Sequence, residues 1–295
     1  MTAQGSSPRI FVTGASGQLG KLAIEALLQR VPATSVVAGV RDMSKARDLH
    51  AHGVESRMAD YDKPEQLAVA FRGIDRLLLI SGNAVGQRTR QHTAVIAAAK
   101  AAGVKLVAYT SILRADTSKV GLAVEHKATE AALAASGVPH VLLRNGWYLE
   151  NFAGRATTAL QSGSVLTCAG DGRFSAAARA DYAAAAATVL ASAGGHAGEK
   201  LELAGSSSFS MAEFAALVAR TAGKPVAYNN MTQEAYEAAL MKAGLPDFVA
   251  AILSNSDASA ADGWLQDDSR TLEKLIGAPT TPLKTVVEAA VRAAV

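Results

Sequence analysis

Short apolar runs alternate with segments of helical period through the first half of the chain. Five apolar runs predict strands, and a weaker sixth is expected at 54–60; the five lie at 9–13, 35–40, 75–80, 105–110 and 140–144. The helical segments between them lie at 17–30, 44–52, 64–72, 90–103 and 124–137. Continuous apolar strands that alternate with helices are typical of a parallel sheet covered on both faces. The pattern therefore predicts a doubly wound α/β domain.

The pattern changes after residue 150, where helical segments dominate and the apolar runs become short and isolated. Helices are expected at 210–222, 232–243 and 284–294, and short strands at 164–170, 199–205 and 224–229. We therefore predict a first domain over residues 1–150 and a smaller, mostly helical lobe over residues 151–295. The boundary is approximate because the two parts are expected to interleave, with the lobe walling a substrate cleft.

A glycine-rich turn joins the first predicted strand to the first predicted helix. Gly14, Gly17 and Gly20 recur at every third position in the segment TGASGQLG. Such glycines allow a tight turn, close approach of a diphosphate and close packing of helix on strand, while N–H groups at the helix start face the phosphates. We prefer this interpretation to an ordinary glycine turn, and it predicts a Rossmann-type dinucleotide site formed by Gly14, Ala15, Ser16, Gly17, Gln18, Leu19 and Gly20.

The residues after the second predicted strand indicate which dinucleotide is bound. An NAD site usually has Asp or Glu here to accept from the ribose 2′-OH. In this chain Arg41 comes first, with Lys45 and Arg47 close behind. A guanidinium favours a 2′-phosphate through charge-assisted hydrogen bonds. We therefore predict NADPH (NADP) as the cofactor; the alternatives are that Asp42 serves a ribose and that Arg41 is a solvated loop residue.

The composition narrows the setting in which the protein works. Of 295 residues, 49% are apolar and 19% are charged, which argues for a compact globule. The net charge of +3 comes from scattered basic residues, so we expect no nucleic-acid partner. Cys168 is the single cysteine, and no zinc-type spacing or metal site is visible. Without a secretory signal or a membrane helix of roughly 20 apolar residues, we expect a cytoplasmic protein with no membrane contact.

Six segments spread over nearly the whole chain carry a family pattern. They are VTGASGQLGK (12–21), LLLISGNAVGQR (77–88), AAKAAGVKLVAYTSILRADTS (98–118), LLRNGWYLENF (142–152), ARADYAAAAA (178–187) and KLIGAPTTPL (274–283). With these segments the chain resembles the NmrA-like group of atypical short-chain dehydrogenases/reductases, and within it the bacterial type 2 NAD(P)H:quinone oxidoreductases. Triphenylmethane dye reductases share much of the pattern.

The resemblance implies a cofactor site built from three further segments. Arg41 would hold the 2′-phosphate, and the loop after the fourth strand would line the cofactor cleft with Ser81, Gly82 and Asn83. The segment after the sixth strand would border the nicotinamide with Asn145, Gly146, Trp147 and Tyr148. All of these residues lie at carboxyl ends of predicted parallel strands, where open α/β sheets bind ligands.

The Tyr-x-x-x-Lys pair of most short-chain dehydrogenases is missing from its expected place. Judged by the pattern of relatives, the lysine falls on His126 and the tyrosine on Leu122. Alcohol–carbonyl chemistry needs such an acid/base pair, whereas a quinone accepts hydride readily and its product can be protonated by water. His126 and Tyr148 are the candidate catalytic residues; packing is the alternative for both, and a helix cap is the alternative for Asn145.

Three functions are compatible with these residues. The leading prediction is an oxidoreductase that passes hydride from NADPH to a quinone-like small molecule without flavin, with a homodimer as one option for its assembly. A second is a redox sensor that binds NADP(H) and performs no chemistry. A third is a reductase of another conjugated acceptor, such as a triphenylmethane dye.

Overall fold

Two compact units interleave along the chain in the computed structural model, which describes residues 7–294 apart from the side chains of Asp48 and His50. The first unit comprises the residues up to Ile112, Glu125–Arg144 and Arg179–Leu201. The second comprises Leu113–Val124, Asn145–Ala178 and the residues from Glu202 onward. The assignment of dinucleotide binding to residues 1–150 and of the substrate-binding lobe to residues 151–295 stays a prediction.

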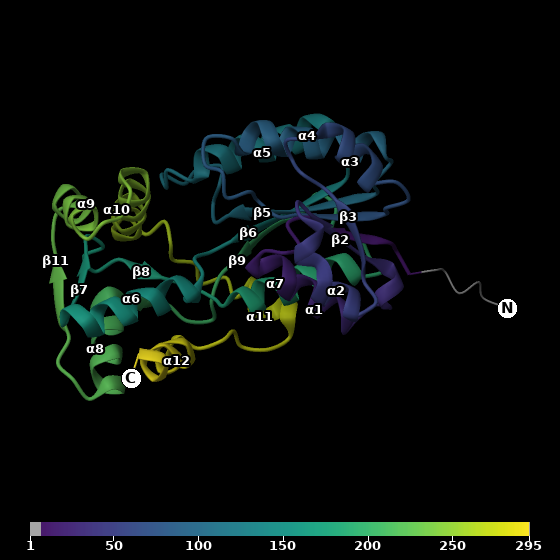
Figure 1. Ribbon diagram of the computed structural model, residues 1–295. Coiled ribbons are helices and arrows are strands. Elements are labelled where there is room, and N and C mark those ends of the chain that lie inside the picture. Colours follow the sequence, from purple (N-terminus) through teal and green to yellow (C-terminus); the bar gives the residue numbers. More distant parts are fainter. Residues whose placement is uncertain (1–6, 295) are drawn as a thin grey trace. The chain divides into compact units, whose positions relative to one another are not determined.

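A seven-stranded sheet with the order β3-β2-β1-β4-β5-β6-β9 forms the centre of the first unit (Figure 1). Its strands are β1 (Ile10–Val12), β2 (Val36–Val40), β3 (Glu55–Met58), β4 (Arg76–Leu79), β5 (Leu106–Ile112), β6 (His140–Asn145) and β9 (Lys200–Leu203). The pairs β1–β2, β1–β4, β2–β3 and β4–β5 are parallel. The order reverses between β1 and β4, so the sheet is doubly wound, as predicted, and its ligand-binding switch point lies at these two strands.

Helices cover both faces of this sheet (Figure 1). On one face lie α1 (Gln18–Leu28), α2 (Arg47–Ala51) and α7 (Arg179–Ala191); on the other lie α3 (Pro64–Ala70), α4 (Arg88–Ala101) and α5 (Ala123–Ser136). The short turns η1 (Ala33–Ser35) and η2 (Met43–Ala46) flank β2. Most of the alanines of α7 are buried, and small side chains let this helix pack closely beside α1.

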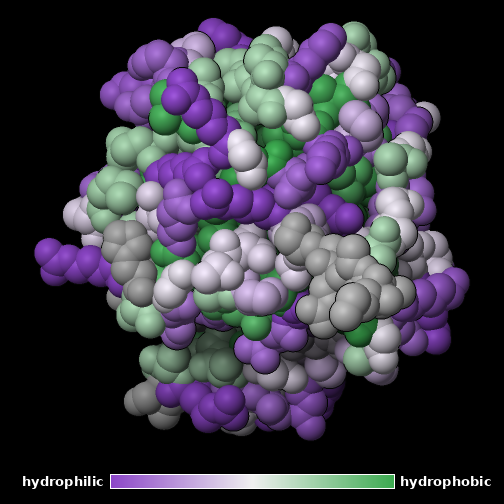
Figure 2. All heavy atoms as spheres, turned by 90° about the vertical axis from the view of Figure 1, so that its right-hand side faces the viewer, coloured by the Kyte–Doolittle hydropathy of each residue, from purple (hydrophilic) through white to green (hydrophobic). Residues whose placement is uncertain are grey.

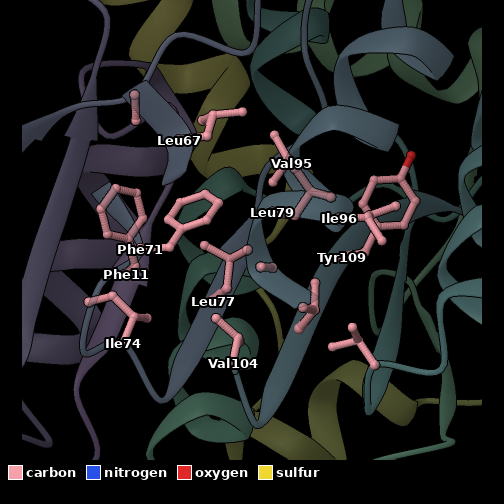
Figure 3. Packing of buried hydrophobic residues seen from close by; sticks show 14 of the residues in the cluster. Phe11, Leu67, Phe71, Ile74, Leu77, Leu79, Val95, Ile96, Val104 and Tyr109 are labelled. Atoms are coloured by element: carbon pink, nitrogen blue, oxygen red, sulfur yellow. The ribbon is translucent and has the colours of Figure 1, made fainter. Parts of the chain in front are cut away.

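One core of the first unit lies between the sheet and the helices α3, α4 and α5. Phe11 of β1 meets Phe71 edge to face, with ring centroids 5.0 Å apart, and Figure 3 shows Leu77 beside Phe71 and Val95 beside Leu79. The Tyr109 ring belongs to the same cluster. A Cβ on Gly39 of β2 would lie 2.4 Å from the Phe11 ring, so a larger residue at position 39 would displace that ring.

The second unit is mostly helical, as predicted. Its helices are α6 (Leu149–Ser162), α8 (Met211–Ala222), α9 (Gln233–Lys242), α10 (Asp247–Ala261), α11 (Thr271–Ile276) and α12 (Leu283–Ala294). Two small sheets pair β7 (Ser164–Thr167) with β11 (Ala227–Asn230), and β8 (Arg173–Phe174) with β10 (Phe209–Ser210). Phe152 packs edge to face against Phe174, Phe209 and Phe214, and this aromatic cluster holds α6 and α8 to the β8–β10 pair.

The surface mixes polar and apolar residues. On the face drawn in Figure 2, hydrophobic patches are small and lie among hydrophilic side chains. The exposed large apolar side chains of the described residues, such as Val69 and Phe248, are scattered along the sequence. Within residues 7–294, no helix combines the length and the apolar character that crossing a membrane requires.

Candidate cofactor site

The glycine turn after β1 is built from backbone contacts. Gly14 has a φ of +58°, which favours glycine, and the Gly17 N–H donates to the Gly14 carbonyl at 2.9 Å. The Ala15 N–H donates to the carbonyl of Gly39 at 3.0 Å, which ties the turn to β2. A Cβ on Gly20 would lie 2.3 Å from the Gly14 carbonyl oxygen. The turn and the start of α1 therefore pack too closely for any side chain at position 20.

The start of α1 has the properties of an anion site. Its N-cap is Gly17, and no side chain of the described chain caps the helix. The first turn also contains no acidic residue, so nothing in that turn repels a negative charge. N–H groups at a helix start together with the helix dipole favour phosphate. The segment from Gly14 to Gly20 therefore fits the diphosphate of a dinucleotide.

The two charged residues after β2 differ in their contacts. The Asp42 carboxylate accepts from the backbone N–H of Ser44 at 2.9 Å and from its hydroxyl at 2.7 Å, and thereby caps η2. These two hydrogen bonds hold the pKa of Asp42 below its usual range. The Arg41 side chain is exposed directly after the strand. The acidic residue thus has a local structural task, and the assignment of Arg41 to the 2′-phosphate stays a prediction.

The loop after β4 is held by three side chains on two other elements, β5 and α4. The Ser81 N–H donates to the Thr110 hydroxyl at 2.9 Å, and the Gly82 N–H donates to Nε2 of His92 at 3.0 Å. The Gly82 carbonyl accepts from Nε of Arg88 at 2.6 Å. Asn83 is exposed. Ser81, Gly82 and Asn83 therefore have a fixed backbone at the carboxyl end of β4, beside the switch point.

Asn145 ends β6 and is 5% exposed. Its side-chain oxygen is buried and has no hydrogen-bond partner among the described residues, although buried polar atoms are almost always paired. Helix α6 begins at Leu149 with Tyr148 as its N-cap, so the alternative of a helix cap at Asn145 is wrong. An unpaired buried acceptor at the end of a strand fits a ligand that brings an N–H donor.

The segment that follows Asn145 is fixed through its backbone. The Gly146 N–H donates to the Leu203 carbonyl at 2.7 Å, and the Trp147 carbonyl accepts from the Ala177 N–H at 3.1 Å. Trp147 and Tyr148 are half-buried. Their assignment to the nicotinamide end of the site stays a prediction.

His126 lies in a different environment from the one expected of a proton donor. The side chain is 6% exposed, and its Nδ1 is hydrogen-bonded to the Tyr109 hydroxyl at 2.8 Å. Burial, together with the positive charge of Arg88, lowers the pKa of His126 to about 3. An imidazole with so low a pKa holds no additional proton at neutral pH. This geometry favours the alternative role of His126 in packing α5 against β5.

The hydroxyl of Ser111, a residue of β5, is engaged by a buried carboxylate. It donates to Oε1 of Glu130 at 2.6 Å. The same carboxylate accepts from Nε of Arg144 at 3.0 Å and from its Nη2 at 2.7 Å. All three residues are buried, so this group joins β5, α5 and β6. The hydroxyl of Ser111 therefore takes part in a buried structural network.

Sequence reasoning overlooked the buried polar residues beneath these loops. His92 and Thr129 are fully or almost fully buried, and the Tyr61 hydroxyl contacts Thr13, directly before the glycine turn. A signal was available on α4: His92 shares a helix face with Val95, Ile96 and Ala99. A histidine on an apolar helix face requires a buried partner.

A doubly wound sheet with a glycine turn opening into an uncapped helix defines the class of dinucleotide-binding α/β proteins. Within that class the chain belongs to the NmrA-like family, whose family model matches residues 6–283.

Relatives of known activity resemble the chain over most of its length. Quinone oxidoreductase 2 of Escherichia coli (strain K12) is 52% identical over 274 residues, which cover 93% of this chain and 96% of that protein. The crystal structure of the NADPH-dependent quinone oxidoreductase of E. coli in complex with NADPH matches with a TM-score of 0.93 and 51% identity, and covers 95% of this chain and 99% of the other. Citrobacter sp. triphenylmethane reductase in complex with NADP(H) matches with a TM-score of 0.90 and 38% identity, over 95% and 99% of the two chains.

Proposed function

We propose that this protein is an NADPH-dependent quinone oxidoreductase that works without flavin. The observation that carries the proposal is the uncapped, acid-free start of α1 behind a glycine turn that excludes side chains. This turn occurs in a chain that is 52% identical to a quinone oxidoreductase over 93% of its length. The fold positions the turn at the switch point of the sheet, where ligands of this class bind.

The binding task divides among backbone and side chains. Residues Gly14 to Gly20 hold the diphosphate through N–H groups and the dipole of α1. Arg41 pairs with the 2′-phosphate, for which a planar guanidinium is well suited. The capped Asp42 does not compete for the ribose, because its carboxylate already accepts two hydrogen bonds from Ser44. The combination favours NADPH over NADH.

The reducing end of the site requires little acid/base chemistry. The bound nicotinamide supplies hydride, and Asn145 would accept a hydrogen bond from its carboxamide through the buried side-chain oxygen that lacks a partner among the described residues. Trp147 and Tyr148 would provide aromatic surface for a flat acceptor. A quinone needs no built-in proton donor, which agrees with a buried, neutral His126. The task of the protein is therefore to orient the two reactants and to exclude competing reactions.

Two alternatives concern the same site. A triphenylmethane dye as acceptor is favoured by the 38% identity to a triphenylmethane reductase over nearly the whole of both chains. A redox sensor without chemistry would bind NADP⁺ and NADPH and reduce neither class of acceptor.

Oxidation rates of NADPH and NADH with a panel of quinones and dyes test the proposal, with wild type compared to Arg41→Ala. We expect NADPH consumption with simple benzoquinones by flavin-free protein. In Arg41→Ala the KM for NADPH rises about ten- to a hundred-fold with little change in kcat, because a charge-assisted contact worth about 1.5–3 kcal/mol is lost. The KM for NADH stays unchanged.

Arg72→Ala is the matched control, because Arg72 is exposed on the same unit and far along the chain from β2. Its KM for NADPH should equal that of wild type. Failure of the flavin-free wild-type protein to oxidise NADPH with any quinone would contradict the proposal. If the protein reduced dyes but no quinone, the first alternative, a triphenylmethane dye as acceptor, would replace it.

Setting and assembly complete the proposal. We infer from the sequence that the protein acts in the cytoplasm, and we propose a homodimer as the assembly to be tested. Cell fractionation and sedimentation of the purified protein test these two inferences separately.

A further inference from the structure

The loop after β4, residues Ser81–Gln87, is clamped by buried and half-buried groups that the proposed chemistry does not use. We call this segment the β4 loop. Its backbone makes four hydrogen bonds to side chains of neighbouring elements. They are Ser81 N–H to Thr110 Oγ1, Gly82 N–H to His92 Nε2, Gly82 carbonyl from Arg88 Nε, and Gly86 N–H to Glu125 Oε2. These hydrogen bonds tie both ends of the loop to neighbouring elements.

His92 contributes through a defined proton arrangement. Nε2 accepts from the Gly82 N–H at 3.0 Å, so this nitrogen carries no proton. The proton of the neutral ring is then on Nδ1, which donates to the Thr129 hydroxyl at 2.9 Å. The Thr129 hydroxyl in turn donates to the Glu125 carbonyl at 2.9 Å. Every polar atom in this series is paired, and the series connects the β4 loop to α5.

The surroundings keep His92 neutral and fixed. Its side chain is 0% exposed and lies between the rings of Tyr61 and Tyr109, with centroids at 6.1 Å and 5.5 Å, both edge to face. Arg88 is the charged group that acts on the imidazole. A buried ring beside a cation loses the ability to hold a second proton. The acceptor function of Nε2 is thus preserved at neutral pH.

Glu125 completes the clamp from the first turn of α5. Its Oε2 accepts from the Gly86 N–H at 3.0 Å, and its Oε1 accepts from the Arg88 N–H at 3.0 Å. Because Arg88 is the first residue of α4, this carboxylate caps that helix from a neighbouring helix. One end of the β4 loop is held by His92 and the other by Glu125.

We propose that His92 is a positioning residue for the nucleotide site: its Nε2 holds the Gly82 N–H and, with Glu125 at the far end, fixes the β4 loop in the conformation that receives the cofactor. This inference rests on the proposed function, because the β4 loop is the segment assigned to the cofactor cleft. His92 itself touches neither nucleotide nor acceptor. Its effect is on cofactor binding through the pre-formed loop, since a pre-ordered loop loses less conformational entropy when the ligand binds.

The test compares His92→Leu, which removes the acceptor at similar volume, with His92→Gln, whose side-chain oxygen can still accept from Gly82. We expect the KM for NADPH of His92→Leu to rise about ten-fold, the equivalent of one buried hydrogen bond, with kcat unchanged. His92→Gln should restore most of the loss. Hydrogen–deuterium exchange of peptides spanning residues 81–88 should accelerate in His92→Leu and in Glu125→Ala in the absence of nucleotide.

Val95→Ala is the control for loss of stability alone, because Val95 is fully buried on the same helix and does not contact the β4 loop by hydrogen bonds. It should lower the melting temperature without changing the KM for NADPH or the exchange of residues 81–88. If His92→Leu does not fold, the test uses His92→Gln and Thr129→Val instead. Thr129→Val leaves Nδ1 of His92 without its partner, so it should raise the KM for NADPH and accelerate the exchange of residues 81–88.

The outcomes separate the inference from the proposed function. An active wild-type protein whose folded His92 and Thr129 variants keep wild-type KM and wild-type exchange overturns the inference and leaves the function intact. An equal rise of KM in Val95→Ala also overturns it. A wild-type protein that binds no nucleotide overturns the proposed function first, while the exchange of residues 81–88 still reports whether His92 holds the loop.

Discussion

Two buried polar networks, one in each unit, hold their surroundings in different ways. Beneath the nucleotide loops of the first unit, Tyr61, His92 and Thr129 form neutral hydrogen bonds, and each ends on a loop or helix backbone. In the second unit, Arg155 and Asp257 form an ion pair with two hydrogen bonds of 2.9 Å and 2.8 Å. The first arrangement orients backbone for a ligand, and the second binds helices together.

The ion pair of the second unit is completed by further contacts. Asp257 is 2% exposed and also accepts from the Thr167 hydroxyl at 2.5 Å. The Arg155 guanidinium lies 5.9 Å from the ring centroids of both Phe152 and Tyr236, and it donates to the Leu166 carbonyl at 3.1 Å. The carboxylate of Asp257 raises the pKa of Arg155. One charge pair thereby joins α6, α10 and the end of β7.

The difference between the two networks is one of charge. The neutral hydrogen bonds of Tyr61, His92 and Thr129 orient loop and helix backbone without adding a charge; the charged groups of the first unit are Arg88 and Glu125 at the β4 loop and the buried Glu130–Arg144 pair, among others. In the second unit the Arg155–Asp257 pair is tolerated because its polar atoms are hydrogen-bonded. The comparison predicts different costs for disrupting the two regions.

The largest effect is expected from Asp257→Asn. This change leaves the half-buried Arg155 guanidinium without its charged partner and should cost about 2–3 kcal/mol of the free energy of unfolding. Urea denaturation followed by circular dichroism measures the loss. The double variant Asp257→Leu/Arg155→Met, which removes both charges, should recover much of it. A loss below about 1 kcal/mol in the single variant would show that the pair is effectively solvated and would remove the contrast between the units.

Acid should weaken the first unit through its two buried imidazoles. Burial lowers the pKa of His92 to about 4 and that of His126 to about 3, while both rings titrate near 6.5 when unfolded. Between these values the unfolded chain binds more protons than the folded one, so stability present above pH 6.5 is lost as the pH falls toward 4. Between pH 7 and pH 5 we expect a loss of about 1–2 kcal/mol for each imidazole.

Denaturant unfolding at pH 7 and pH 5 measures this loss, with the double variant His92→Gln/His126→Gln as the comparison. The double variant should show a smaller difference between the two pH values than wild type. Equal differences in both proteins would assign the acid sensitivity to other groups.

A smaller cost is expected where a neutral hydrogen bond is removed from the first unit. The single proton of the Tyr61 hydroxyl has two acceptors within reach, Thr13 Oγ1 at 2.5 Å and the Ile80 carbonyl at 2.8 Å. Tyr61→Phe should therefore reduce the free energy of unfolding by about 1 kcal/mol. The same denaturation series measures it beside Asp257→Asn. A cost equal to that of Asp257→Asn would contradict the distinction between neutral and charged networks.

The mildest test concerns Cys168, which lies beside the ion pair. The thiol is 9% exposed and donates to the Ser254 carbonyl at 3.2 Å, and burial raises its pKa to about 11. At pH 8 it should react with Ellman's reagent far more slowly in the native protein than in denaturant, where one thiol is released. Rapid reaction in native buffer would show that this region opens frequently.

The sequence predicted the strands of the first unit well because buried parallel strands are continuous apolar runs. The weak run at 54–60 is the edge strand β3, which is partly exposed and therefore less apolar. Strand β9 was expected only as an isolated run, because nothing local indicates that residues near 200 pair into a sheet begun at residue 10. Helices α6 and α10 were not predicted; the buried face of α10 is interrupted by serines and Asp257, and half of the buried face of α6 is alanine.

The candidate site was predictable only where the chemistry is local. The glycine turn and Arg41 are visible because one short segment contains all the features that matter. The role of Asp42 depends on Ser44, two residues away, and could have been suspected from the Asp-x-Ser pattern of a cap. The pairing of Gly82 with His92 depends on how α4 packs against the end of β4, and no spacing in the sequence indicates it.

Calorimetric titration of NADPH into the purified protein, with Gly20→Ala titrated alongside, tests the central claim most directly. We predict one-to-one binding with a dissociation constant on the order of micromolar for wild type. Binding should be lost in Gly20→Ala, because its Cβ would lie 2.3 Å from the Gly14 carbonyl oxygen. No heat of binding with the wild-type protein, or equal binding by a folded Gly20→Ala variant, would contradict the account.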